Sequence, residues 1–142
     1  MQRYLNKISG PLLDRIDLHV EVTPVSFNEL SAQSRSEPSA SVRERVIKAR
    51  ARQEERFEAE ADTYCNAQMS SRKLKEICVI SQVGANLLRT AMERLNLSAR
   101  AYDRILKVSR TIADLENSEE IRPEHLAEAI QYRSLDREGW AG

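Results

Sequence analysis

The chain opens with a strand-like pattern. Between residues 16 and 22 the apolar side chains Ile, Leu, Val and Val alternate with polar Asp, His and Glu, which is the period of a half-buried β-strand. A Ser9-Gly10-Pro11 turn precedes this unit and Pro24 follows it. No second strand pattern follows, and a single strand leaves its backbone groups unpaired. We therefore expect its sheet partners in upstream sequence that this chain does not include.

After Pro24 the apolar positions follow a helical period. A short helix is predicted over residues 27–32 and a polar loop over 33–40. Ser41 and Glu44 have the spacing of a capping box, which predicts a long helix from there to about Ala61. That helix is charged, with a narrow apolar stripe made of Val42, Val46, Ile47, Ala49 and Phe57.

The remaining sequence predicts a compact helical bundle. Helices are expected over residues 71–79 and 81–95, from an N-cap at Ser98 to about Glu116, and from Pro123 to about Ser134. The predicted fold class is mainly α, a helical bundle with one short N-terminal strand. Four parts are expected: a terminal piece of an α/β core (1–24), a linker with the charged helix (25–61), the bundle (62–135) and a frayed tail (136–142).

Composition limits what the chain can bind. Its 22 basic residues balance 22 acidic ones, so no net field draws the whole molecule onto nucleic acid or membrane. Cys65 and Cys78 form no C-x-x-C pair, and His19 and His125 are far apart in sequence, so no metal site is expected. With no membrane-length apolar run and no signal peptide, we predict a reduced, cytoplasmic protein without membrane contact.

The sequence gives little sign of a catalytic centre. Only four glycines occur, at positions 10, 84, 139 and 142, so neither a G-x-x-x-x-G-K-[ST] phosphate loop nor a G-x-G-x-x-G turn is present. We interpret both histidines as structural or surface residues, and both cysteines as small core residues. The carboxylates at positions 14, 17 and 21 are more simply explained by a strand with one polar side than by acid–base catalysis.

Two arginines are of more interest. Arg100 lies in the first turn after Ser98, where the helix dipole disfavours a cation by roughly 0.3–1 kcal/mol; a nearby anion would remove that cost. From position alone, a screened surface arginine is the favoured interpretation. Arg15 precedes the strand, and from position alone a salt bridge with Asp14 or Asp17 is favoured there.

Four segments carry a resemblance to a known family: residues 4–20 (YLNKISGPLLDRIDLHV), 66–69 (NAQM), 97–108 (LSARAYDRILKV) and 125–133 (HLAEAIQYR). They resemble the magnesium-chelatase-like AAA+ ATPases of the competence-protein (ComM/YifB) type. The resemblance covers nearly the whole chain, and residues 34–61 are its least distinctive part.

The resemblance implies roles for the two arginines. Arg15, in the Leu-Leu-Asp-Arg segment, would be an arginine finger that acts in trans on the nucleotide of a neighbouring subunit. Arg100, in Ser-Ala-Arg, would be the sensor-2 arginine, which contacts nucleotide in cis. ATP and Mg²⁺ are the cofactors expected for the full-length parent. The Walker A and Walker B segments are absent here, so we expect neither bound nucleotide nor ATP hydrolysis from this chain alone.

The resemblance also implies partners: an upstream ATPase core, a homo-oligomeric ring expected to be a hexamer, and DNA, since such proteins are implicated in DNA processing during transformation. For DNA contact, six basic residues between positions 43 and 56 are available, but glutamates are interleaved with them, which favours a solvated charged helix. The alternative function is a free-standing helical module that binds DNA or protein and has no ATPase activity.

Overall fold

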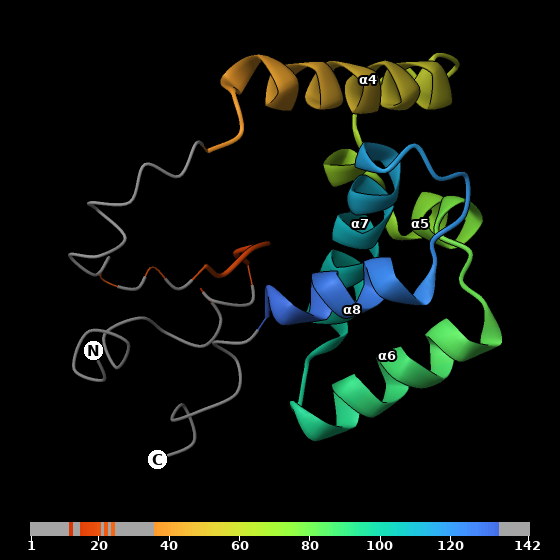
Figure 1. Cartoon of the computed structure of the whole chain (residues 1–142). Helices are drawn as coiled ribbons and strands as arrows, with labels where there is room; N and C mark the ends of the chain where they lie inside the picture. Colours follow the sequence, from red (N-terminus) through yellow and green to blue (C-terminus); the bar gives the residue numbers. More distant parts are fainter. Residues whose placement is uncertain (1–11, 13–14, 21, 23, 25–35, 134–142) are drawn as a thin grey trace.

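A computed structural model describes residues 12, 15–20, 22, 24 and 36–133 of the chain. In that part the elements are α4 (Ser39–Phe57), the short 3-10 helix η1 (Asn66–Gln68), α5 (Ser71–Ile77), α6 (Gln82–Arg94), α7 (Ala99–Leu115) and α8 (Pro123–Gln131). Figure 1 shows α7 in the middle of the bundle, with α4 lying across one end of it and α6 and α8 toward the other. The mainly α fold class is confirmed.

Serine caps fix the start of three helices. The hydroxyl oxygens of Ser70, Ser81 and Ser98 accept hydrogen bonds from backbone N–H groups of the first turns of α5, α6 and α7. Each bond satisfies a donor that the helix itself leaves open. These helices therefore begin within a residue of the predicted positions, and α8 begins at Pro123 as expected.

The predicted capping box at Ser41 and Glu44 is wrong. Helix α4 begins two residues earlier, at Ser39, with Pro38 as its N-cap and no side-chain cap. The Pro38 carbonyl accepts hydrogen bonds from the N–H groups of Ser41 and Val42, at 3.0 and 3.3 Å. Because Ser41 is already inside the first turn, its hydroxyl is not in a capping position. The helix also ends at Phe57 rather than near Ala61.

The apolar stripe of α4 divides into two halves. Ala49 and Phe57 are buried, together with Gln53 between them. Val42, Val46 and Ile47 are exposed, because the half of α4 that begins at Ser39 extends past the end of α7 (Figure 1). Only the second half of α4 therefore contributes to the core.

The core forms around α7. Its buried face carries Ala101, Ile105, Leu106, Ile112 and Ala113, and each fully buried Leu or Ile contributes about 1.5–3 kcal/mol. The rest of the apolar cluster comes from the other helices and their connections: Phe57, Met69, Leu74, Cys78, Leu88, Ile121, Leu126 and Ala129. It is almost entirely aliphatic, in keeping with a chain that has few aromatic residues.

The predicted strand is not formed among residues 15–20, which are turn, bend or irregular backbone without a strand partner. Leu18 and Val20 are 47% and 66% exposed, whereas His19 between them is buried. For residues 18–20, burial is thus the reverse of what the alternating pattern predicts. The physical reason is that a strand needs a neighbouring strand, and none is available in the described part of the chain. The helix predicted over 27–32 lies outside the described residues.

Candidate functional site

Arg100 lies in the first turn of α7, as predicted. The helix begins at Ala99, and the Ser98 hydroxyl accepts a hydrogen bond from the N–H of Ala101 at 3.2 Å. The Arg100 side chain is exposed and forms no hydrogen bond or ion pair with the described residues. No acidic residue lies in this first turn, so the arginine and the positive end of the helix together favour an anion at this position.

Arg15 occupies a turn near the start of the described chain. Its N–H donates to the Leu12 carbonyl at 3.0 Å, and its side chain is exposed. The salt bridge with Asp17 that position alone favours is not formed, because Asp17 pairs instead with Arg104 of α7. Asp14 lies outside the described residues. The guanidinium of Arg15 is therefore available for contacts outside the described part of the chain.

The 15–20 segment, which contains Arg15, lies against the bundle through polar contacts. The Asp17 carboxylate pairs with Arg104, and the Ile16 carbonyl accepts a hydrogen bond from the guanidinium of Arg133. The His19 N–H donates to the Tyr132 carbonyl at 2.8 Å. The segment that carries one candidate arginine thus contacts the helix that carries the other.

The cysteines and histidines, the other titratable candidates, are buried or half-buried. Cys78 is buried, and burial raises the pKa of its thiol to about 11, so it stays protonated and behaves as a small apolar residue. Cys65 is half-buried. His19 and His125 are both buried. Within the described ranges, no group of three or more His, Cys, Asp or Glu side chains is placed to hold a metal ion, and no helix is long and apolar enough to cross a membrane.

Comparison with known proteins identifies the family. Residues 36–133 match the family model described as magnesium chelatase, subunit ChlI C-terminal, and residues 1–30 match the model described as magnesium chelatase, subunit ChlI. The chain belongs to the magnesium chelatase ChlI family. Arg15 lies in the segment that matches the second model, and Arg100 in the segment that matches the C-terminal model.

Curated proteins similar to this chain include competence protein ComM of Haemophilus influenzae, which is 45% identical over 138 residues. Two proteins called YifB, from Salmonella typhimurium and Escherichia coli, are 43% and 41% identical. These matches cover 95–96% of this chain but only 26% of each relative. The chain therefore spans about a quarter of the length of the relatives that it matches.

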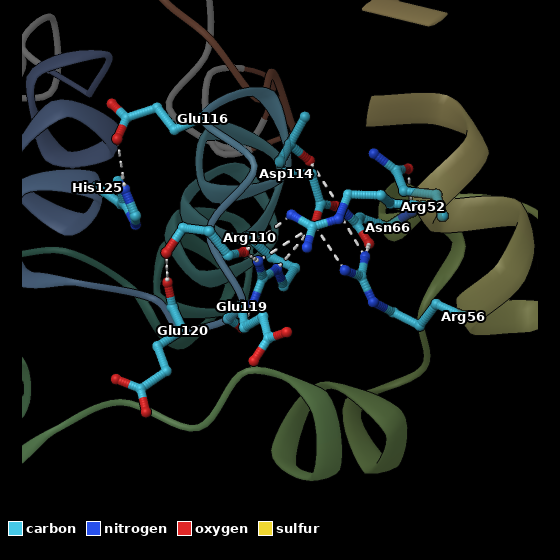
Figure 2. A network of polar contacts seen from close by, with 12 residues as sticks. Arg52, Arg56, Asn66, Arg110, Asp114, Glu116, Glu119, Glu120 and His125 are labelled. Atoms are coloured by element: carbon cyan, nitrogen blue, oxygen red, sulfur yellow. Dashed lines mark hydrogen bonds and ion pairs between the residues drawn. The ribbon is translucent and has the colours of Figure 1, made fainter. Parts of the chain in front are cut away.

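A buried polar cluster in this ChlI-type region was not predicted from the sequence. Figure 2 shows Asp114 of α7 in contact with Arg56 of α4 and Asn66 of η1. Arg56 donates to both Asp114 carboxylate oxygens, at 2.5 and 2.8 Å, and the Asn66 amide donates to one of them at 2.8 Å. Arg110, one turn before Asp114, donates to the same carboxylate at 3.2 Å. One carboxylate thus joins two helices and η1.

Contacts within the cluster shift the pKa values of Asp114 and Arg110. Burial alone would raise the pKa of Asp114, but the hydrogen bonds from Arg56 and Asn66 and the positive charges of Arg56 and Arg110 outweigh it, so the pKa is lowered. Burial lowers the pKa of Arg110, and the Asp114 charge opposes that change. Arg110 also donates to the carbonyls of Ser118 and Glu119, at 2.6 and 2.7 Å, which fixes the α7–α8 connection.

This cluster changes the interpretation of the basic residues on α4. Arg56 belongs to the cluster, and Arg52 donates to the Ser118 carbonyl at 3.3 Å. Arg45 pairs with Glu37. Half of the six basic side chains therefore have partners within the chain, and the helix is only partly the solvated charged surface that was predicted.

Proposed function

We propose that this chain is the lid region of a ring-forming AAA+ ATPase, in which Arg15 is an arginine finger in trans and Arg100 a sensor-2 residue in cis. The observation that carries the proposal is the ChlI family match together with the exposure of both side chains. Neither guanidinium forms a hydrogen bond or ion pair with a described residue. Both are therefore free to contact a phosphate group.

The chemistry of arginine fits this role. A guanidinium is permanently charged, planar and able to donate two parallel hydrogen bonds to phosphate oxygens. It can therefore stabilise charge that spreads over a transferring phosphoryl group without moving a proton. ATP supplies the phosphoryl group. The loop that binds its phosphates and the residues that bind Mg²⁺ would come from the remainder of the protein. The contribution of this chain is limited to sensing and stabilising charge.

The test is made in the full-length ATPase that carries this region. We expect Arg15→Ala to abolish hydrolysis while ATP binding is retained, because the finger acts on the neighbouring site. Mixing Arg15→Ala subunits with subunits that carry a Walker A mutation should partly restore turnover, since each then supplies what the other lacks. Normal hydrolysis by Arg15→Ala rings would show that Arg15 is not the finger.

Arg100 is tested by the same substitution and mixing experiment, but mixing the variant with other subunits should not restore hydrolysis at the variant's own site. Arg100→Ala should abolish hydrolysis in its own site, and partner subunits should not rescue that site. Arg94→Ala is the matched control, because Arg94 is exposed on α6 and has no hydrogen-bond or ion-pair partner among the described residues. Unchanged turnover in Arg100→Ala would exclude the sensor role.

DNA is the proposed substrate of the whole protein. The support comes from the relative named as a competence protein and from the basic residues of α4 that have no partner among the described residues, Arg43, Lys48 and Arg50. Phosphate contacts by these side chains would make DNA binding weaker as salt increases. Replacing all three by Gln should lower DNA affinity and reduce the slope against salt. Hydrolysis that is insensitive to DNA would contradict this proposal.

A further inference from the structure

We propose that Arg104 is a positioning residue, which with Arg133 holds the 15–20 segment against α7 and α8, so that Arg15 and Arg100 move as one unit. The contacts themselves do not depend on the proposed function. The consequence for hydrolysis does rest on the roles proposed for Arg15 and Arg100.

Polar contacts are needed to tether the 15–20 segment, because its apolar side chains are only partly buried. Leu18 and Val20 remain 47% and 66% exposed, so the burial of apolar surface supplies only part of the free energy of docking. Arg104 instead pairs with the Asp17 side chain.

Two further contacts reach the backbone of the segment. The guanidinium of Arg133, which is only 1% exposed, donates to the Ile16 carbonyl. The His19 N–H donates to the Tyr132 carbonyl at 2.8 Å. The tethers therefore fall on residues 16, 17 and 19, immediately after Arg15.

The Asp17–Arg104 pair closes a short path between the two candidate arginines. Arg15 lies two residues before Asp17, which is at most about 7 Å of extended chain. Arg100 lies one turn before Arg104 on the same face of α7, about 6 Å along the helix. A rotation of α7 would therefore move Arg15 as well as Arg100.

This linkage gives a route for communication around a ring. A change at the nucleotide that Arg100 contacts would shift α7 in that subunit. Through Arg104 the same shift would move Arg15 relative to the nucleotide of the neighbouring subunit. Arg104 would then act through Arg15 without touching nucleotide itself.

The tether is first tested on this chain alone, by hydrogen exchange at the His19 N–H. We expect Arg104→Ala to increase exchange at that amide two- to fivefold, the range that an exposed ion pair supports. The charge-swapped double variant Arg104→Asp with Asp17→Arg should restore protection, and the control Arg94→Ala should leave exchange unchanged. Unchanged exchange in Arg104→Ala would overturn the tether. Arg133 is unsuited to this test, because removing a buried guanidinium risks unfolding the end of α8.

The functional consequence is tested in full-length rings. Arg104→Ala should lower kcat for ATP several-fold with KM for ATP unchanged, and the charge-swapped pair should restore kcat. If Arg15→Ala rings hydrolyse ATP normally, the finger assignment fails while the exchange result still stands. If Arg15→Ala is inactive but Arg104→Ala turns over like the parent protein, the positioning role is wrong and the proposed function stands.

Discussion

Asp114 accepts two hydrogen bonds from Arg56, 58 residues earlier in the chain, with N–O distances of 2.5 and 2.8 Å. The Asp114 side chain is fully buried, while the Arg56 side chain retains 20% exposure. The pair attaches the second half of α4 to the central helix α7. Phe57, the next residue of α4, attaches the same half of the helix through apolar contacts with the core.

Asp114→Asn should reduce the free energy of unfolding by about 3–5 kcal/mol, because it leaves buried Arg110 without its counter-charge. Urea denaturation followed by circular dichroism measures the loss. Glu54→Gln is the matched control, since Glu54 is exposed on α4, and it should change stability by no more than about 0.5 kcal/mol. A loss below about 1 kcal/mol in Asp114→Asn would mean that the cluster does not stabilise the fold.

The same carboxylate predicts how stability depends on pH. The pKa of Asp114 is lower in the folded chain than in the unfolded chain. Its contribution is therefore complete above the unfolded pKa, about 3.9, and is lost as pH falls through the folded pKa. One such group changes the unfolding free energy by up to about 1.4 kcal/mol per pH unit. Denaturation between pH 2 and 6 should show this component in the parent chain, and its presence in Asp114→Asn would contradict the assignment.

The sequence predicted local features well. The starts of α6, α7 and α8 follow from Ser81, Ser98 and Pro123, because caps and first-turn prolines act within a few residues. The start of α4 was wrong because a backbone carbonyl, that of Pro38, takes the place of a side-chain cap. No residue type marks such a start.

Long-range contacts could not be predicted in the same way. Asn66 and Asp114 are 48 residues apart, and the spacing of apolar residues does not show which polar groups will meet. One signal was present: Arg110 and Asp114 follow Leu106 at intervals of four and lie on the apolar face of α7. Charged residues in that position need buried partners. The position of Arg100 in the first turn of α7 could be predicted because the nearby Ser98 sets the start of that helix. The contact of Asp17 with Arg104 could not, because these residues are 87 positions apart.

Gly84 allows α6 to pack closely on α8. A Cβ at this position would lie 2.7 Å from the Cδ1 of Leu126, a side chain that is fully buried. Gly84→Ala should therefore lower stability by about 1–3 kcal/mol despite the better helix propensity of Ala. The cost should be smaller when Leu126 is also replaced by Val, as a double-mutant cycle would measure. A stabilising Gly84→Ala would show that Leu126 moves aside freely.

His125 replaces the usual carboxylate or amide in the cap of α8. The Arg122 N–H donates to its Nδ1 at 3.0 Å, so the proton of the neutral ring is on Nε2, which lies 3.0 Å from Glu116 Oε2. The hydrogen bond from His125 is the main cause of the lowered pKa of Glu116, and the positive charge of Arg122 adds to it. The ring thus links the start of α8 to the end of α7.

Gln at position 125 can reproduce both contacts, since its oxygen accepts and its amide nitrogen donates. We expect His125→Gln to cost at most about 1 kcal/mol, and His125→Ala to cost roughly 2–4 kcal/mol, because Ala loses the cap and leaves a cavity in a fully buried position. Thermal and urea unfolding of the two variants measure the difference. Equal losses in both would mean that the size and shape of the ring, rather than its two hydrogen bonds, stabilise this end of α8.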